Sequence, residues 1–177
     1  MKVVYAALIS ALGFASVPVL AQSAGPTDPQ IASIVVTANQ VDIDAGKYAE
    51  SKTNSAAVKQ FAALMVTDHS SVNKAAADLA HKLGVTPQDN PTSQSLKHAG
   101  DENIEKLKAL SGEQLDRAYV DHEVAYHQLV LDAMDKALIP SAQNQELKDL
   151  LVKVRPAFVQ HLEHAKHLQA TLGKGDA

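Results

Sequence analysis

The segment VKQFAALMVTDHSSVNKAAADLAHKLG, residues 58–84, decides the fold class. Its apolar side chains recur every three or four residues, which places them on one face of an α-helix. Gly84 follows the last of them and is a residue type that commonly ends a helix. A β-strand requires alternation with a period of two and is rarely this long. The segment therefore predicts one amphipathic helix.

The same helical period extends along the chain on both sides of this segment. It predicts further helices over residues 28–54, 92–110, 111–139 and 144–172, with proline, glycine and polar residues between them. No segment alternates apolar and polar residues as a half-buried strand does. The sequence therefore predicts an all-α fold.

The predicted helix lengths indicate a topology. Four of the five helices have about 26 to 29 residues, or roughly 40 Å each, whereas residues 92–110 form a shorter helix. We therefore expect a ferritin-like four-helix bundle, made of two antiparallel hairpins with the short helix as the crossover between them. Because residues 111–139 are apolar on two sides, we expect the crossover helix to pack on them.

The N-terminal residues predict export from the cytoplasm. Met1 and Lys2 give a short basic start, a long apolar run follows, and Ala21 ends a plausible signal-peptidase site. We expect residues 1–21 to be a cleaved signal peptide, and the protein to be periplasmic or secreted. No later segment is long and apolar enough to act as a membrane anchor.

The mature chain then divides into three parts. We expect residues 22–27 to be a flexible lead-in, residues 28–173 to be the bundle domain and residues 174–177 to be a C-terminal tail. A domain of this length can bury a substantial apolar core without a disulfide or a structural metal.

The composition excludes several classes of protein. The chain has no cysteine, which excludes disulfide scaffolds, zinc fingers, iron–sulfur proteins, thiol enzymes and lipid-modified lipoproteins. With 16 Lys and Arg against 20 Asp and Glu, the net charge is −4 and no basic cluster stands out, so we expect no nucleic-acid partner. The sequence leaves protein partners and homo-oligomerisation open.

Ionisable residues interrupt the apolar stripes of four predicted helices. His69, His127 and His161 each lie between apolar residues of their own helix, and Asp42 lies on the helix over residues 28–54. All four are near the midpoints of their helices, so a bundle would bring them to within about 5 Å of one plane. Three imidazoles and a carboxylate suit one transition-metal ion such as iron, manganese, zinc or copper.

Three further residues are weaker candidates for the same site. Asp68 and Glu123 suit partners of the histidines or extra metal ligands, although a solvated or ion-pairing role is the more common one for such residues. His164 lies one turn after His161 and could chelate a metal with it, or could be an exposed residue near a helix C-terminus. His122 competes with His127, because the two point about 140° apart on a helix.

Two other interpretations fit the same residues. The histidines could form a structural hydrogen-bonded layer in an envelope or stress-related protein that binds no metal. They could also make the bundle sensitive to pH, because protonated histidines in one layer would repel each other near pH 6.

Several short motifs resemble one bacterial family of exported proteins, the domain-of-unknown-function family 4142, which is ferritin-like. The motifs are Met65-Val66-Thr67-Asp68-His69, then Ser111-Gly112, Asp116-Arg117-Ala118-Tyr119 and His127, and finally Pro156 with His161-Leu162. The chain departs from the family pattern at Asp42, where Glu is usual, and at Leu115, where Phe is usual. The resemblance implies a secreted ferritin-like bundle and no particular activity.

One feature of the wider ferritin-like class is missing. Its di-iron centres use Glu-x-x-His motifs on two helices, and the sequence contains no Glu-x-x-His. We therefore do not expect a ferroxidase-type di-iron centre. The sequence leaves enzymatic activity open and favours a non-enzymatic protein.

Overall fold

The computed structural model describes residues 25–172, and all regular structure in this range is helical. The long helices are α1 (Asp28–Lys52), α2 (Ala56–Leu83), α3 (Pro91–Lys108), α4 (Gly112–Ala133) and α6 (Gln145–Leu172). The predicted all-α fold is confirmed. The predicted signal peptide (1–21) and C-terminal tail (174–177) lie outside the described residues, as does the first half of the lead-in (22–27).

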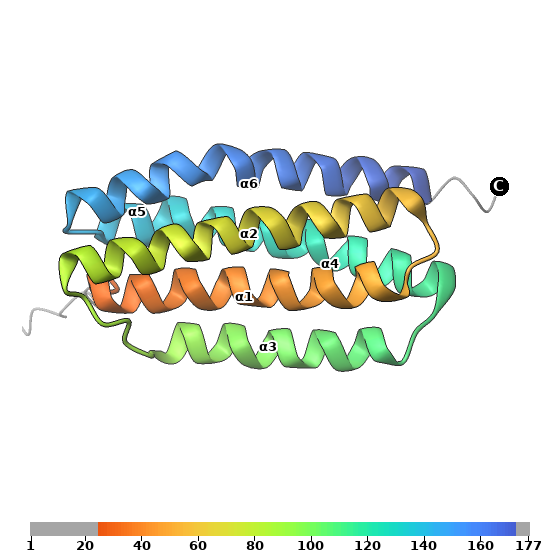
Figure 1. Ribbon diagram of the computed structural model, residues 1–177, viewed down its shortest axis with the longest axis horizontal. Helices are drawn as coiled ribbons and strands as arrows, with labels where there is room; N and C mark the ends of the chain where they lie inside the picture. The colour runs from red at the N-terminus through yellow and green to blue at the C-terminus, as the bar shows by residue number, and fades with distance from the viewer. Residues whose placement is uncertain (1–24, 173–177) are drawn as a thin grey trace, which may run out of the picture.

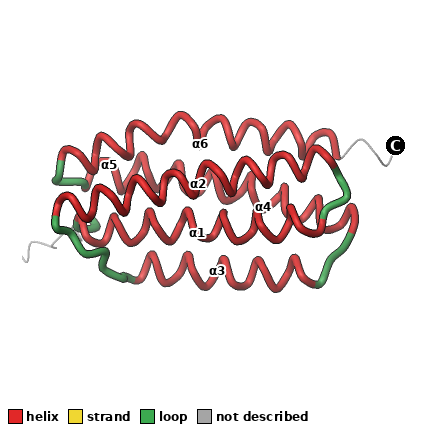
Figure 2. Tube along the Cα trace, in the orientation of Figure 1, coloured by secondary structure: helices red, strands yellow, loops and turns green. Residues whose placement is uncertain are grey.

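The five long helices run along one common axis (Figure 1). α1 and α2 are antiparallel and pack side by side, and so do α4 and α6. The two pairs face each other, because α2 also packs on α6 and α1 on α4. Figure 2 shows the connecting loops gathered at the two ends of the molecule. Among the described helices, none combines the length and apolar character needed to cross a bilayer.

The helix that decides the fold class, α2, begins and ends as its sequence requires. Ser55 precedes it, and the Ser55 hydroxyl accepts a hydrogen bond from the Val58 amide at 3.3 Å. Gly84 follows it with a φ of 63°, a left-handed conformation that costs glycine little. The Gly84 amide donates back to the last turn of α2, so the predicted helix end is confirmed.

The crossover helix α3 packs along α1 and touches α4 only weakly, so the expectation that it covers α4 was wrong. The loop before α3 is tied to the start of α1, because the Gln88 amide donates to the Pro29 carbonyl at 2.9 Å. Gly100 then lets the two helices approach closely: a Cβ atom there would lie 2.7 Å from Cγ2 of Val41. The path of this loop, rather than the pattern on α4, decides where α3 lies.

The end of α4 also differs from the prediction of one helix that continues to Ile139. α4 ends at Ala133 and continues as a π-helical turn, η1 (Met134–Leu138), and a short α5 (Ile139–Ser141). In η1 the Ile139 amide donates to the Met134 carbonyl, five residues earlier. Pro140 lies in the first turn of α5, where a missing amide is tolerated, so it does not stop the helix as predicted.

Two apolar clusters fill the interior, one towards each end of the molecule. One cluster joins Ile31 to Val41 of α1 with the end of α4 and the first half of α6. The other joins Ala45 and Ala49 of α1 with the start of α2, the start of α4 and the end of α6. Asp42, His69 and Glu123 fall between these clusters along their helices, and all three are buried. The middle of the molecule therefore contains a buried polar layer.

Candidate metal centre

Four helices each contribute to the buried polar layer. Its members are Asp42 from α1, His69 from α2, Glu123 and His127 from α4, and His161 from α6. Their exposed fractions are 1%, 0%, 0%, 0% and 4%. Since burying ionisable groups is unfavourable without compensation, this layer requires an explanation. The four residues that we predicted as ligands are all in it.

The three imidazole rings form a compact triangle. Ring centroids lie 5.3 Å apart for His69 and His161, 5.4 Å for His127 and His161, and 5.5 Å for His69 and His127. One ring nitrogen from each histidine lies within 4.8 Å of the others. The histidine cluster, defined here as His69, His127 and His161, therefore presents three nitrogens to one small volume.

A hydrogen bond fixes which nitrogen of His69 carries the proton. The Nδ1 atom lies 2.7 Å from Oδ1 of Asn39, and the Asn39 amide nitrogen donates to the Val35 carbonyl at 2.9 Å. Because this second bond orients the Asn39 amide, its oxygen must be the acceptor and His69 Nδ1 the donor. The Nε2 atom of His69 therefore keeps a free lone pair.

The other two histidines are held in the same way. His127 donates from Nδ1 to the Glu123 backbone carbonyl at 3.0 Å, and His161 donates from Nε2 to Asp68 Oδ2 at 2.9 Å. Within residues 25–172, no hydrogen-bond partner reaches Nε2 of His69, Nε2 of His127 or Nδ1 of His161. Each ring therefore has one nitrogen oriented by an acceptor and one available lone pair, as in the histidine ligands of metal sites.

The buried environment keeps the histidine cluster neutral. Burial lowers the pKa of His69 well below 6.5, and the neighbouring His127 and His161 lower it further. Burial likewise lowers the pKa of His127 to about 4. Burial lowers the pKa of His161 too, although Asp68 opposes this shift. Neutral imidazole is the form that binds metal ions.

Two carboxyl groups lie beside the histidine cluster. Asp42 Oδ2 is 3.3 Å from His69 Nε2, and Glu123 Oε2 is 3.4 Å from His127 Nδ1. Asp42, Glu123 and His127 each place one possible ligand atom within 4.8 Å of the other two. Burial raises the pKa of Glu123 to about 8, and burial together with the nearby Glu123 raises the pKa of Asp42 well above its usual range. At neutral pH the pair therefore retains at least one proton.

The weaker candidates have different outcomes. Glu123 is fully buried, which excludes the solvated half of the solvated or ion-pairing role that we considered more common for it. Asp68 is 40% exposed and stays at the edge of the layer, where it accepts the hydrogen bond from His161. His122 stacks on Tyr126 with ring centroids 5.3 Å apart, and its Nδ1 lies 3.8 Å from Glu123 Oε1.

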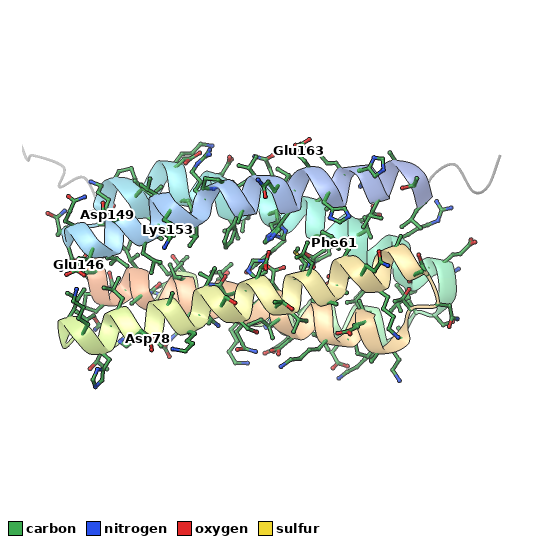
Figure 3. The ribbon with its side chains drawn as sticks, turned by 45° about the horizontal axis from the view of Figure 1, so that its top comes forward. Phe61, Asp78, Glu146, Asp149, Lys153 and Glu163 are labelled. Carbon is green, nitrogen blue, oxygen red and sulfur yellow. The ribbon has the colours of Figure 1, made fainter. Side chains whose placement is uncertain are left out.

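Of the two roles considered for His164, the structure shows the exposed one, since His164 does not join His161 in the polar layer. It is exposed, and its ring packs edge-on against Phe61 with centroids 5.0 Å apart. Figure 3 shows Phe61 on the side of α2 that faces α6, whereas Glu163, the residue before His164, points outward. The position of His164 one turn beyond the layer places it beside α2 rather than in the histidine cluster.

Sequence reasoning did not identify Asn39, which orients His69. Asn39 is 2% exposed and precedes Asp42 by three residues on the same side of α1. An amide in the middle of a helix on the apolar side was the available signal. Its meaning depends on the position of His69, which a single helix does not reveal.

Comparison with known proteins gives one match. Residues 15–168 match a family described as a domain of unknown function (DUF4142). No curated protein and no solved structure matches the chain. Because the match spans most of the sequence and includes the four helices that form the polar layer, this chain belongs to the DUF4142 family.

Proposed function

We propose that the protein is an exported, ferritin-like four-helix bundle that binds one transition-metal ion in its buried polar layer, for storage, buffering or redox protection. The observation that carries this proposal is the orientation of the histidine cluster. Three neutral rings each use one nitrogen in a hydrogen bond, and the other nitrogen makes no hydrogen bond among the described residues, with Asp42 Oδ2 at 3.3 Å from that of His69. A purely structural layer would be expected to satisfy these atoms.

The fold part of the proposal has its own support. α1 with α2 and α4 with α6 are antiparallel neighbours. The crossover helix α3 runs along α1 and carries the chain from the end of α2 back to the start of α4 (Figure 1). This is the connectivity of ferritin-like bundles, in which metal ligands project inward from facing helices. Export to the periplasm or beyond rests on the sequence of residues 1–21 alone.

The ligand chemistry favours iron, manganese, zinc or copper. The proposed ligands are His69, His127, His161 and Asp42, with Glu123 as a further carboxylate. Imidazole and carboxylate ligands without a thiolate suit these ions. Nitrogen ligands at about 2.0 Å from a tetrahedral ion lie roughly 3.3 Å apart, so metal binding would draw the three rings slightly closer. The carboxyl groups would lose their proton and offset the charge of the ion.

A matched pair of variants on α6 tests the metal site. In protein purified from the periplasm without a histidine tag, we expect near-stoichiometric metal by elemental analysis. His161→Ala should lower the metal content at least tenfold, because it removes one ligand of the histidine cluster. His164→Ala should leave it unchanged, because His164 is an exposed histidine on the same helix. Circular dichroism should show unchanged helicity in both variants.

The alternative function predicts a different result. If the histidines are only structural, native protein reconstituted with iron, copper, manganese and zinc would bind none of them. His161→Ala would then reduce helicity or stability without changing the metal content. That outcome would favour a non-enzymatic envelope or stress-related protein whose partners lie elsewhere on its surface.

A further inference from the structure

A large cavity lies on the side of α4 that α3 leaves uncovered. Its volume is about 640 Å³, and its walls come from α1, the start of α3, the end of α4 with η1, and α6. Leu129, Ala133 and Ala137 form the wall on the α4 side, and Leu129 is 55% exposed. Part of the apolar surface of α4 that the sequence led us to assign to helix packing thus lines this cavity.

The lining of this cavity carries no charge. Among the described residues that line it, none is Asp, Glu, Lys, Arg or His. Three of its few polar side chains are already engaged: Gln30 accepts from the Thr27 amide, Asn90 caps α3, and Asn39 bonds to His69 and Val35. A ligand with a buried charge would therefore find no compensating group, whereas an uncharged apolar molecule would bury its surface favourably.

The inner end of the cavity reaches the histidine cluster. Asn39 and Phe158 both line the cavity, and both contact His69. The Phe158 ring packs edge-on against His69 with centroids 4.9 Å apart, and it also lies 6.0 Å from His127. Phe158 thus separates the cavity from the polar layer.

The π-helical turn η1 is a second structural feature of the cavity. Met134, Ala137 and Leu138 of η1 all line it. Such turns are rare and often occur at functional sites, because the wider coil redirects the side chains that follow. Here the π-helical turn falls where α4 meets the cavity.

We propose that this cavity binds a small, uncharged apolar molecule, such as a neutral lipid-like alcohol, with its inner end beside Asn39 and Phe158. The volume lies within the range of roughly 300 to 1,000 Å³ that is typical of small-molecule sites. The proposal goes beyond metal binding and does not depend on it, because the cavity is lined by residues outside the histidine cluster. An ion in the polar layer would be next to the bound molecule.

The neutral fluorescent probe N-phenyl-1-naphthylamine tests this proposal on metal-free protein whose processed N-terminus has been verified by mass spectrometry. We expect saturable binding of one probe per chain. Ala133→Phe and Ala137→Phe place bulk in the cavity and should each weaken binding at least tenfold. Ala125→Phe makes the same change at an exposed position of α4 outside the lining and should have no effect. Circular dichroism would identify a variant that fails to fold.

Displacement of the probe tests the chemistry of the ligand. Dodecanol should displace the probe at least tenfold more effectively than dodecanoate, which has the same chain and a negative charge. In an NMR spectrum, dodecanol should shift the side-chain amide signals of Asn39 and leave those of Asn103, which does not line the cavity, unchanged.

Three results would overturn the proposal: non-saturable probe binding, unaltered binding in both cavity variants, or equal displacement by dodecanoate. The variant with alanine at positions 69, 127 and 161 separates this proposal from the metal site. It should bind no metal and still bind the probe.

Discussion

Asp42 and Glu123 form the least usual contact in the protein, because two carboxyl groups are buried side by side. Within the described part of the chain, no hydrogen-bond donor reaches Asp42 Oδ1 or either carboxyl oxygen of Glu123. The two carboxyl groups lie close to each other, and a retained proton removes the repulsion between them. Asp42 Oδ2 also lies 3.3 Å from His69 Nε2. The histidines beside them are held neutral. The layer thus holds neutral groups near neutral pH, and under the proposed function its carboxyl groups would become ionised ligands when a cation enters.

In metal-free protein, these opposite pKa shifts predict a stability maximum near pH 6.5. The histidines bind protons more weakly in the folded chain, so their contribution is complete above pH 6.5 and is lost as the pH falls towards 4. The carboxyl groups bind protons more strongly in the folded chain, so their contribution is complete below about pH 4.5 and is lost as the pH rises through 8. Each proton that is bound in only one of the two states, folded or unfolded, changes the free energy of unfolding by roughly 1 kcal/mol per pH unit. Between pH 4.5 and 6.5, rising pH restores the contribution of three histidines and removes that of two carboxyl groups. The free energy of unfolding should therefore rise with pH in this range.

Urea unfolding in the presence of a chelator, followed by circular dichroism from pH 4 to pH 9, measures this profile. Glu123→Gln should reduce the loss of stability on the alkaline side and retain the loss on the acid side. Glu113→Gln, on the exposed first turn of α4, should leave the profile unchanged. Equal stability at pH 5, 6.5 and 8 would contradict the assigned protonation states.

At the scale of helices, α1 rather than α4 is the element covered on opposite sides. Val41 faces Gly100 of α3, and its neighbour Asp42 faces the polar layer. Neighbouring residues of a helix point about 100° apart, so Val41 and Asp42 cannot face the same direction. The observed answer is that α1 has two buried sides. Helical periodicity showed two apolar sides on residues 111–139, but it could not show which helix the crossover helix would cover.

The close contact between α1 and α3 predicts that the effect of Gly100→Ala on the free energy of unfolding changes sign when Val41 is shortened. Gly100→Ala should lower the free energy of unfolding by roughly 1 to 2 kcal/mol, because overpacking against the stiff Val41 side chain outweighs the better helix propensity of alanine. In a Val41→Ala background the same change should become stabilising by up to about 1 kcal/mol. Thermal and urea unfolding of the four proteins in this cycle measures both values.

Ala99→Gly is the control for this cycle. Ala99 is an exposed neighbour of Gly100, so its substitution reports helix propensity alone and should cost about 1 kcal/mol in both backgrounds. If Gly100→Ala had the same effect on stability with Val41 and with alanine at position 41, the packing of α3 on α1 would not depend on the close contact between Gly100 and Val41.

The parts of the candidate site that could be predicted are those that follow from the apolar pattern of a single helix. His69, His127 and His161 interrupt apolar stripes at the same depth, and the structure brings them together. The partners of these histidines were harder to identify. Asn39 and Asp68 acquire their roles only from the rotation of α1 and α2 against the other helices. The burial of Glu123 likewise follows from the packing of four helices, which no periodicity within α4 determines.

At the scale of the whole molecule, apolar clusters on both sides of the polar layer hold the helices together independently of the proposed metal ligands. Each cluster joins side chains of α1, α4 and α6, so these helices are held together at both ends without the ligands. The protein should therefore fold without metal. The polar layer between the clusters opposes stability, because its unpaired buried atoms lose their contacts with water. A bound ion would reverse this unfavourable contribution.

Metal should therefore raise the melting temperature of a protein that is already folded. With free metal at about 100 times the dissociation constant, binding to the folded state alone adds roughly 2.7 kcal/mol. For a chain of this size the corresponding rise is roughly 5 to 10 °C. Differential scanning calorimetry with and without metal measures it, and a chelator should reverse it. The variant with alanine at positions 69, 127 and 161 should fold and show no rise, because the apolar clusters are intact while the histidine cluster is gone. A rise of equal size in that variant would place the metal on the surface, and an unfolded metal-free protein would show that the two clusters do not hold the helices on their own.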